Sequence, residues 1–148
     1  MDKLIIVGCG GHAKTIIELI SHSKKWEIYG LIGQTHEVGS KILGFKCIGD
    51  NNDLKSIYQD CKNAFIGIGQ IKSPQKRIYI AQLLEELKFN MPIIFSKNAI
   101  ISKFANIKKG SSIGHGSIVN ANSKIGSFCI INSMALIEHD VVIGNFCH

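Results

Sequence analysis

The carboxyl-terminal part of the chain repeats with a period of six residues. Every sixth position from 101 to 143 carries a β-branched aliphatic residue: Ile101, Ile107, Ile113, Val119, Ile125, Ile131, Ile137 and Ile143. Four residues after each comes a small or modest side chain: Ala105, Ser111, Ser117, Ser123, Cys129, Ala135, Val141 and Cys147. Neither the period of a helix nor that of an amphipathic strand gives this pattern. It predicts hexapeptide repeats, each one a short strand with a corner, three of which wind one coil of a parallel β-helix.

Such a coil places its side chains by their position in the hexad. The aliphatic residue should point into the prism, and the small residue should lie where neighbouring coils pack closely. Coils must stack because one coil cannot bury its apolar face alone. The clean hexads make fewer than three coils, and an open end would expose unpaired strand groups. We therefore expect an incomplete β-helix over residues 93–148, in a truncated chain or one whose end a partner covers.

Residues 1–92 follow a different pattern, in which strands alternate with helices. Apolar runs predict strands over 3–7, 27–32 and 64–68, and apolar residues at helical spacing predict a helix from 12 to about 23. Ser73 and Pro74 are typical of an N-cap and first helical position, which predicts a second helix that ends near 88. Alternating strands and helices indicate a Rossmann-like parallel sheet. We expect this domain to bind a ligand and the β-helix to be a second domain.

A glycine-rich loop, GCGGHA at 8–13, follows the first predicted strand. It satisfies the dinucleotide fingerprint, but such sites also need an acid at the end of the second strand, where this chain has Gly33 and Gln34. We interpret the loop as a phosphate cradle at a helix N-terminus. The alternative is a tight turn that binds nothing. The candidate ligand contacts are Gly8, Gly10, Gly11 and His12.

Three ordered blocks of the sequence resemble one family. They are IIVGCGGHAK at 5–14, IGIG at 66–69 with Arg77, and INS, IEHD and VIG between 131 and 144. These blocks resemble the bacterial sugar acyltransferases grouped with sialic-acid O-acetyltransferase and with N-acetyltransferases of UDP-linked 4-amino sugars. The resemblance implies a left-handed β-helix, a homotrimer, acetyl-CoA as co-substrate, and a UDP-sugar held by the glycine loop.

His139 is the candidate general base. Acetyl transfer requires a sugar amine or hydroxyl to lose a proton, and an imidazole with a pKa of roughly 6.5 can accept it at neutral pH. By resemblance Asp140 orients the ring, with Glu138 as the second choice. Residue 139 lies two positions after Ile137 in its hexad, away from the inward site. Without the resemblance, an exposed histidine with no role would be the simpler interpretation.

The resemblance also implies that His148 lies near the acetyl thioester and that Asn132 contacts the substrate. A γ-class carbonic anhydrase, which also uses a hexapeptide β-helix, would need converging zinc ligands, and the hexad register puts His115, His139 and His148 on different faces. The five cysteines form no CxxC pair, so we expect no metal.

Composition excludes some classes of protein. The net charge of +6 suits a phosphate-rich ligand, but the lysines are scattered, so we expect no nucleic-acid partner. No apolar run is long enough to span a bilayer, and the short apolar start lacks a signal-peptide pattern, which predicts a cytoplasmic protein. The sequence thus predicts an acetyl-CoA-dependent sugar N- or O-acetyltransferase. The alternative is a non-catalytic, truncated paralogue that binds a nucleotide-sugar or a partner β-helix.

Overall fold

The computed structural model describes residues 1–148. The chain forms two compact units, Met1–Met91 and Pro92–His148, which are described separately below. None of the helices is long and apolar enough to cross a membrane.

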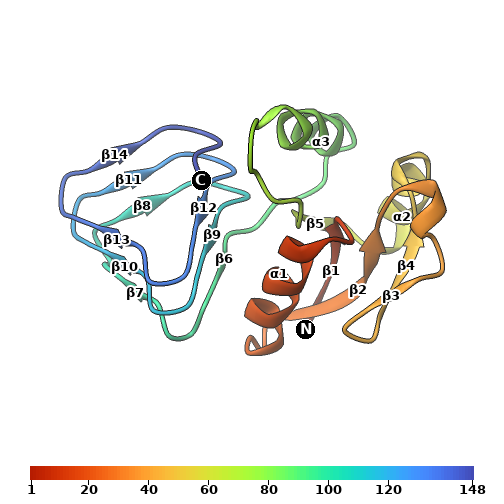
Figure 1. The fold of residues 1–148 in the computed structure, drawn as a ribbon, viewed down its shortest axis with the longest axis horizontal. Coiled ribbons are helices and arrows are strands. Elements are labelled where there is room, and N and C mark those ends of the chain that lie inside the picture. The colour runs from red at the N-terminus through yellow and green to blue at the C-terminus, as the bar shows by residue number, and fades with distance from the viewer. The chain divides into compact units, whose positions relative to one another are not determined.

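The first unit is an α/β unit built on a five-stranded sheet in the order β3-β4-β2-β1-β5 (Figure 1). The strands are β1 (Asp2–Val7), β2 (Trp26–Ile32), β3 (Lys41–Ile42), β4 (Phe45–Gly49) and β5 (Asn63–Ile66). All neighbouring strands are parallel except β3, which pairs antiparallel with β4 at the edge. The end of β1 is an unbroken buried apolar run from Leu4 to Val7, as expected for a central parallel strand.

Three helices and two short 3₁₀ turns accompany these strands, and α3 follows the last of them. They are α1 (Gly11–Ser21), α2 (Leu54–Asp60), α3 (Gln75–Glu86), η1 (Thr35–Glu37) and η2 (Asn51–Asp53). Helix α1 buries Ala13, Ile16, Ile17, Leu19 and Ile20, which is the apolar stripe that predicted it.

The predicted α/β parallel-sheet unit is confirmed, but its details differ in three places. The sequence analysis missed β3, β4 and α2, because the segment from 41 to 60 mixes polar and apolar residues without a clean period. Strand β5 ends at Ile66, two residues early, where the chain leaves the ladder in the glycine pair at 67 and 69. Helix α3 has Pro74 rather than Ser73 at its N-cap, although the Ser73 hydroxyl still accepts a hydrogen bond from the Gln75 N–H at 3.2 Å.

The second unit winds through three short parallel sheets in turn (Figure 1). Its strands are two residues long: β6 (Ile94–Phe95), β7 (Ile100–Ile101), β8 (Asn106–Ile107), β9 (Ser112–Ile113), β10 (Ile118–Val119), β11 (Lys124–Ile125), β12 (Ile130–Ile131), β13 (Leu136–Ile137) and β14 (Val142–Ile143). Each strand pairs with the one three further along the chain, as Ile118 pairs with Leu136. The unit therefore has the strand pairing of a parallel β-helix.

The inward positions of the hexads form the core of this unit. Ile113, Val119, Ile125 and Ile131 are buried there with Cys129, and the remaining inward aliphatic residues pack on them from the outer coils. The predicted small-residue positions are equally tight, since Ser111, Ser117 and Ser123 are fully buried. Each of these serines donates its hydroxyl to a backbone carbonyl of the coil. The hexad pattern thus predicted the direction of the side chains correctly.

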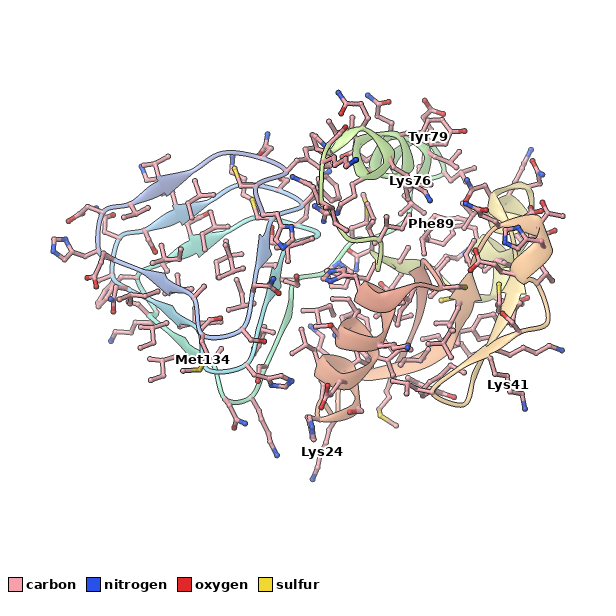
Figure 2. The ribbon with its side chains drawn as sticks, viewed as in Figure 1. Lys24, Lys41, Lys76, Tyr79, Phe89 and Met134 are labelled. Atoms are coloured by element: carbon pink, nitrogen blue, oxygen red, sulfur yellow. The ribbon has the colours of Figure 1, made fainter.

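The corners of the coil repeat as regularly as its core. Every sixth residue from 110 to 146 has a left-handed backbone, with φ between 54° and 69°. Two of these residues are glycines, and the others are Asn122, Phe128, Met134, Asp140 and Phe146. These corner side chains differ in exposure: Met134 is 80% exposed (Figure 2), whereas Phe128 is buried and stacks on the Phe146 ring. Some corners therefore present side chains to solvent, as the corner at Asp140 does.

Candidate functional site

A pocket of about 330 Å³ lies in the α/β unit at the carboxyl ends of its strands. Its lining comes from the loops after β1 and β5, the segment after β2, the turn η2 after β4, and the first half of α3. The lining residues are Val7, Gly8, Cys9, Gly10, Gly11, His12, Ile32, Gly33, Gln34, His36, Glu37, Asn51, Gly67, Ile68, Gly69, Lys76 and Ile80. Strands β2 and β5 flank β1 on opposite sides, so the strand order reverses at this point. Open α/β sheets bind ligands at such a switch point.

The glycine loop forms one wall of the pocket, and its glycines have different reasons to be glycine. Gly8 has φ +139°, and a Cβ atom there would lie 2.7 Å from the carbonyl oxygen of Gly67. By contrast, a Cβ on Gly10 or Gly11 would meet no atom within 4 Å. Gly8 is therefore required by the fold, whereas Gly10 and Gly11 leave open space beside the N-terminus of α1. His12 lines the same pocket.

An acidic residue that the sequence analysis missed forms part of the pocket lining. Glu37 ends the 3₁₀ turn η1 after β2, and its Oε1 accepts a hydrogen bond from the Gln34 N–H at 2.9 Å. The carboxylate lies near the Cys9 thiol. Burial raises the pKa of Cys9 to about 12, helped by the thiol of Cys47 and, more weakly, by the charge of Glu37. Glu37 lies five residues past the end of β2, whereas the dinucleotide fingerprint places its acid at the end of the strand itself.

Lys76 is the single lysine in the pocket lining, which contains no arginine. The sequence analysis did not predict it as a site residue. It stands on the first turn of α3, where Figure 2 labels it. Its neighbour Arg77, part of the quoted family blocks, is instead buried and donates a hydrogen bond from Nη1 to Gln70 Oε1 at 3.2 Å. The pocket thus combines free space near backbone N–H groups, one ammonium group and one carboxylate.

In the β-helix unit, His139 and Asp140 form a hydrogen-bonded pair on the corner after β13. The distance between His139 Nδ1 and Asp140 Oδ2 is 2.6 Å, and the side chains are 74% and 61% exposed. The other carboxylate oxygen of Asp140 accepts a hydrogen bond from Nδ2 of Asn122, which lies one coil below. Asp140 also donates its backbone N–H to the carbonyl of Ala121. The left-handed corner and this chain of bonds fix the carboxylate beside the ring.

These bonds set the charge states of the pair. The hydrogen bond from Asn122 and then that from His139 lower the pKa of Asp140, so its carboxylate is ionised at neutral pH. The bond to Asp140 and its negative charge raise the pKa of His139 above 6.5. An ionised partner at Nδ1 favours the neutral tautomer with its proton on Nδ1, which leaves the Nε2 lone pair directed to solvent. Glu138 contributes only a weak charge effect to the ring.

The other predicted site residues lie elsewhere on the coil. Asn132 Nδ2 and His148 Nε2 are 3.1 Å apart. Asn132 directly follows β12, and the residue before His148 pairs with Ile130 of β12 on the next coil. His115 lies at the corner after β9, with its Nδ1 2.7 Å from the hydroxyl of Ser96. The structure therefore brings His139 together with Asp140, and Asn132 with His148, but the two pairs stand at different corners.

No three His, Cys, Asp or Glu side chains are arranged to hold a metal ion. All five cysteines are free thiols, including Cys129 and Cys147, which follow each other on successive coils.

Solved structures show the same fold at low sequence identity. The chain is similar to a mutant of perosamine N-acetyltransferase from Caulobacter crescentus in complex with CoA and GDP-perosamine, with 23% identity, a TM-score of 0.89, and 97% of this chain and 66% of that chain covered. It is similar to the acetyltransferase domain of PglB from Neisseria gonorrhoeae in complex with acetyl coenzyme A, with 25% identity, a TM-score of 0.84, and coverage of 96% and 67%. WeeI from Acinetobacter baumannii matches with 23% identity, a TM-score of 0.79, and coverage of 97% and 67%.

The chain spans about two-thirds of the length of these structures. No curated protein matches its sequence. The model of the PglD N-terminal domain matches residues 3–84, which is more than half of the chain and includes the glycine loop and the pocket. The chain therefore belongs to the PglD N-terminal domain family, which confirms the predicted resemblance to bacterial sugar acyltransferases.

Proposed function

We propose that the chain is part of an enzyme that transfers an acetyl group from acetyl-CoA to the amine of a nucleotide-linked amino sugar. The observation that carries this proposal is the His139–Asp140–Asn122 chain, which holds an imidazole with its Nε2 directed to solvent. The named activities of the similar solved structures, which are N-acetyltransferases or acetyltransferase domains, support it.

The pocket of the α/β unit is the proposed site for the nucleotide. Phosphate oxygens would accept hydrogen bonds from the backbone N–H groups of the loop at Gly10 and Gly11, where no side chain blocks the approach. Lys76 would neutralise part of the diphosphate charge. His12 borders the same space.

His139 is the proposed general base. Acetyl-CoA supplies a thioester carbonyl to the reaction. As the amine nitrogen forms its bond to that carbonyl carbon and the carbon–sulfur bond breaks, the amine loses a proton to Nε2 of His139. Asp140 holds the ring in the required tautomer and stabilises the imidazolium that results. His148 and Asn132 are the proposed contacts to acetyl-CoA and substrate, and their own hydrogen bond keeps them at one corner.

The test is a free-thiol assay for CoA release with UDP- and GDP-linked 4-amino sugars and with sialic-acid-like sugars that offer only hydroxyl groups. We expect release with an amino sugar and a loss of about 100-fold or more in His139→Asn. His115→Asn is the matched control, because His115 stands in the same register at another corner, and its activity should match the wild type. Equal activity in wild type and His139→Asn would reject the mechanism. Nucleotide binding without CoA release would support the non-catalytic alternative.

We further propose that the coil is left-handed and that three copies assemble through it. Outward side chains on the β7-β10-β13 sheet form an apolar ladder in which Ile100 and Leu136 are 65% and 56% exposed. Such a patch favours a protein partner over water. Sedimentation velocity should show a trimer that Leu136→Glu dissociates, and a wild-type monomer would refute this assembly. The cytoplasmic location stays a prediction.

A further inference from the structure

Two neighbouring strands of the α/β unit end in the same local design. After β2 the chain runs Gly33, Gln34 and the turn η1 that ends in Glu37. Strand β4 itself ends in Gly49, and Asp50 and the turn η2 that ends in Asp53 follow it. In both, the final carboxylate accepts a hydrogen bond from the N–H three residues earlier. The distances are 2.9 Å from Gln34 N to Glu37 Oε1 and 2.9 Å from Asp50 N to Asp53 Oδ2.

The two designs differ in what the acid faces. Glu37 is half-buried and lines the pocket, whereas Asp53 is exposed and does not line it. The bond to Gln34 uses Oε1 of Glu37, and the structure gives Oε2 no protein partner. The local turn therefore needs only one of the two carboxylate oxygens.

The position at which a dinucleotide site carries its acid is closed in this chain. A Cβ at Gly33 would lie 2.8 Å from Cys9 Sγ, 3.0 Å from Cys47 Sγ and 3.1 Å from Glu37 Cβ. No side chain fits there without moving two thiols and the turn. The Cβ atom of Glu37 is itself one of the three atoms that close this position. An acid at residue 37 thus stands next to the place where one at residue 33 would be.

The chemistry of the pocket indicates which part of a nucleotide the carboxylate can meet. A carboxylate repels phosphate, and the proposed site for the phosphates lies at the glycine loop and Lys76, which line the same pocket. A pair of sugar hydroxyl groups is neutral and donates hydrogen bonds, which a carboxylate accepts well. We propose that Glu37 binds the ribose hydroxyls of the nucleoside diphosphate, in place of the acid missing at the end of β2. This inference rests on the proposed nucleotide binding.

Calorimetric titration of the full chain with UDP and GDP, and with their 2′-deoxy counterparts, tests the assignment. For the nucleotide that binds, we expect wild type to prefer the ribose form by about tenfold, the value for one hydrogen bond to a charged group. Glu37→Gln keeps an amide oxygen for the Gln34 N–H but loses the charge, so it should weaken binding of the ribose form about tenfold and leave the deoxy form unchanged. Asp53→Asn, the matched control with the same turn, should bind as wild type does.

The outcomes separate two failures. If wild type binds ribose and deoxy forms equally, or if Glu37→Gln weakens both equally, the ribose assignment is wrong while nucleotide binding stands. If wild type binds neither UDP nor GDP, the proposed nucleotide site fails and this assignment fails with it. Equal binding of ribose and deoxy forms by wild type refutes the assignment even if the variant does not fold. Fluorescence of Trp26, the single tryptophan, reports folding of the unit that holds the pocket.

Discussion

Replacing Gly8 by alanine should unfold the α/β unit at a much lower denaturant concentration, whereas the same change at Gly10 should not. The two glycines are two residues apart in one loop, and both line the pocket. Only Gly8 combines a φ of +139° with a close obstacle, since an added Cβ would lie 2.7 Å from the carbonyl oxygen of Gly67. The pair therefore separates what the loop does for the fold from what it does for a ligand.

The size of the effect follows from two costs at Gly8. A non-glycine residue in this backbone region costs about 1–3 kcal/mol. Overpacking costs a further ~1–3 kcal/mol, and here the obstacle is backbone, which cannot rotate away. Together these costs make the unit less stable by roughly 2–6 kcal/mol, which is a large part of a typical unfolding free energy of about 5–15 kcal/mol. For a unit of this size the melting temperature should fall by at least about 8 °C.

The assay is urea and thermal unfolding of the full chain, followed by Trp26 fluorescence. Trp26 begins β2, is 8% exposed, and is the only tryptophan, so its signal comes from the unit that contains Gly8. In Gly10→Ala the transition should stay within about 1 kcal/mol of wild type, because φ is −100° and no atom lies within 4 Å of the new methyl group. That methyl group would instead occupy pocket space and weaken nucleotide binding. Equal stability of Gly8→Ala and wild type would refute the reasoning.

Three further predictions follow from the β-helix and the thiols. Because a protonated ring cannot accept a proton, kcat/KM should fall as pH drops through the raised pKa of His139. Asp140→Asn should move this acidic limb of the pH–rate profile to lower pH and reduce kcat by about 100-fold or more. An acidic limb at the same pH in the variant would contradict the pairing of His139 with Asp140. At pH 8 iodoacetamide should modify exposed Cys147 long before Cys9, whose pKa is raised to about 12 by burial. Peptide mass spectrometry that shows Cys9 modified first would contradict this order. Ser111→Ala leaves the buried N–H of Cys129 and the carbonyl of Gly126 without their hydrogen-bond partner. Urea unfolding followed by circular dichroism should therefore show a loss of about 1–3 kcal/mol in the free energy of unfolding. An unchanged free energy would mean that the coil rearranges to satisfy these groups.

The sequence predicted those parts of the structure that a period or a fixed spacing encodes. The hexads predicted which side chains of the coil point inward, since Ile113 and Ser111 can be assigned by counting. The glycine loop predicted one wall of the pocket. Glu37 was missed because its proposed role depends on two thiols that crowd Gly33, one in the loop after β1 and the other in β4. The bond from Asn122 to Asp140 joins residues one coil apart, and a local motif does not state which of its neighbours will be used.

The winding of the coil also restricts how its length can change. Each coil uses 18 residues, as the pairing of Ile100 with Ile118 and of Ile118 with Leu136 shows. Inserting six residues before β13 would keep every aliphatic residue inward but would carry His139 to the next face, away from Asn122. Inserting 18 residues would return it to the same face above a new neighbour. Insertions and deletions that respect the core therefore come in steps of six, and only those in steps of 18 preserve the face on which His139 stands.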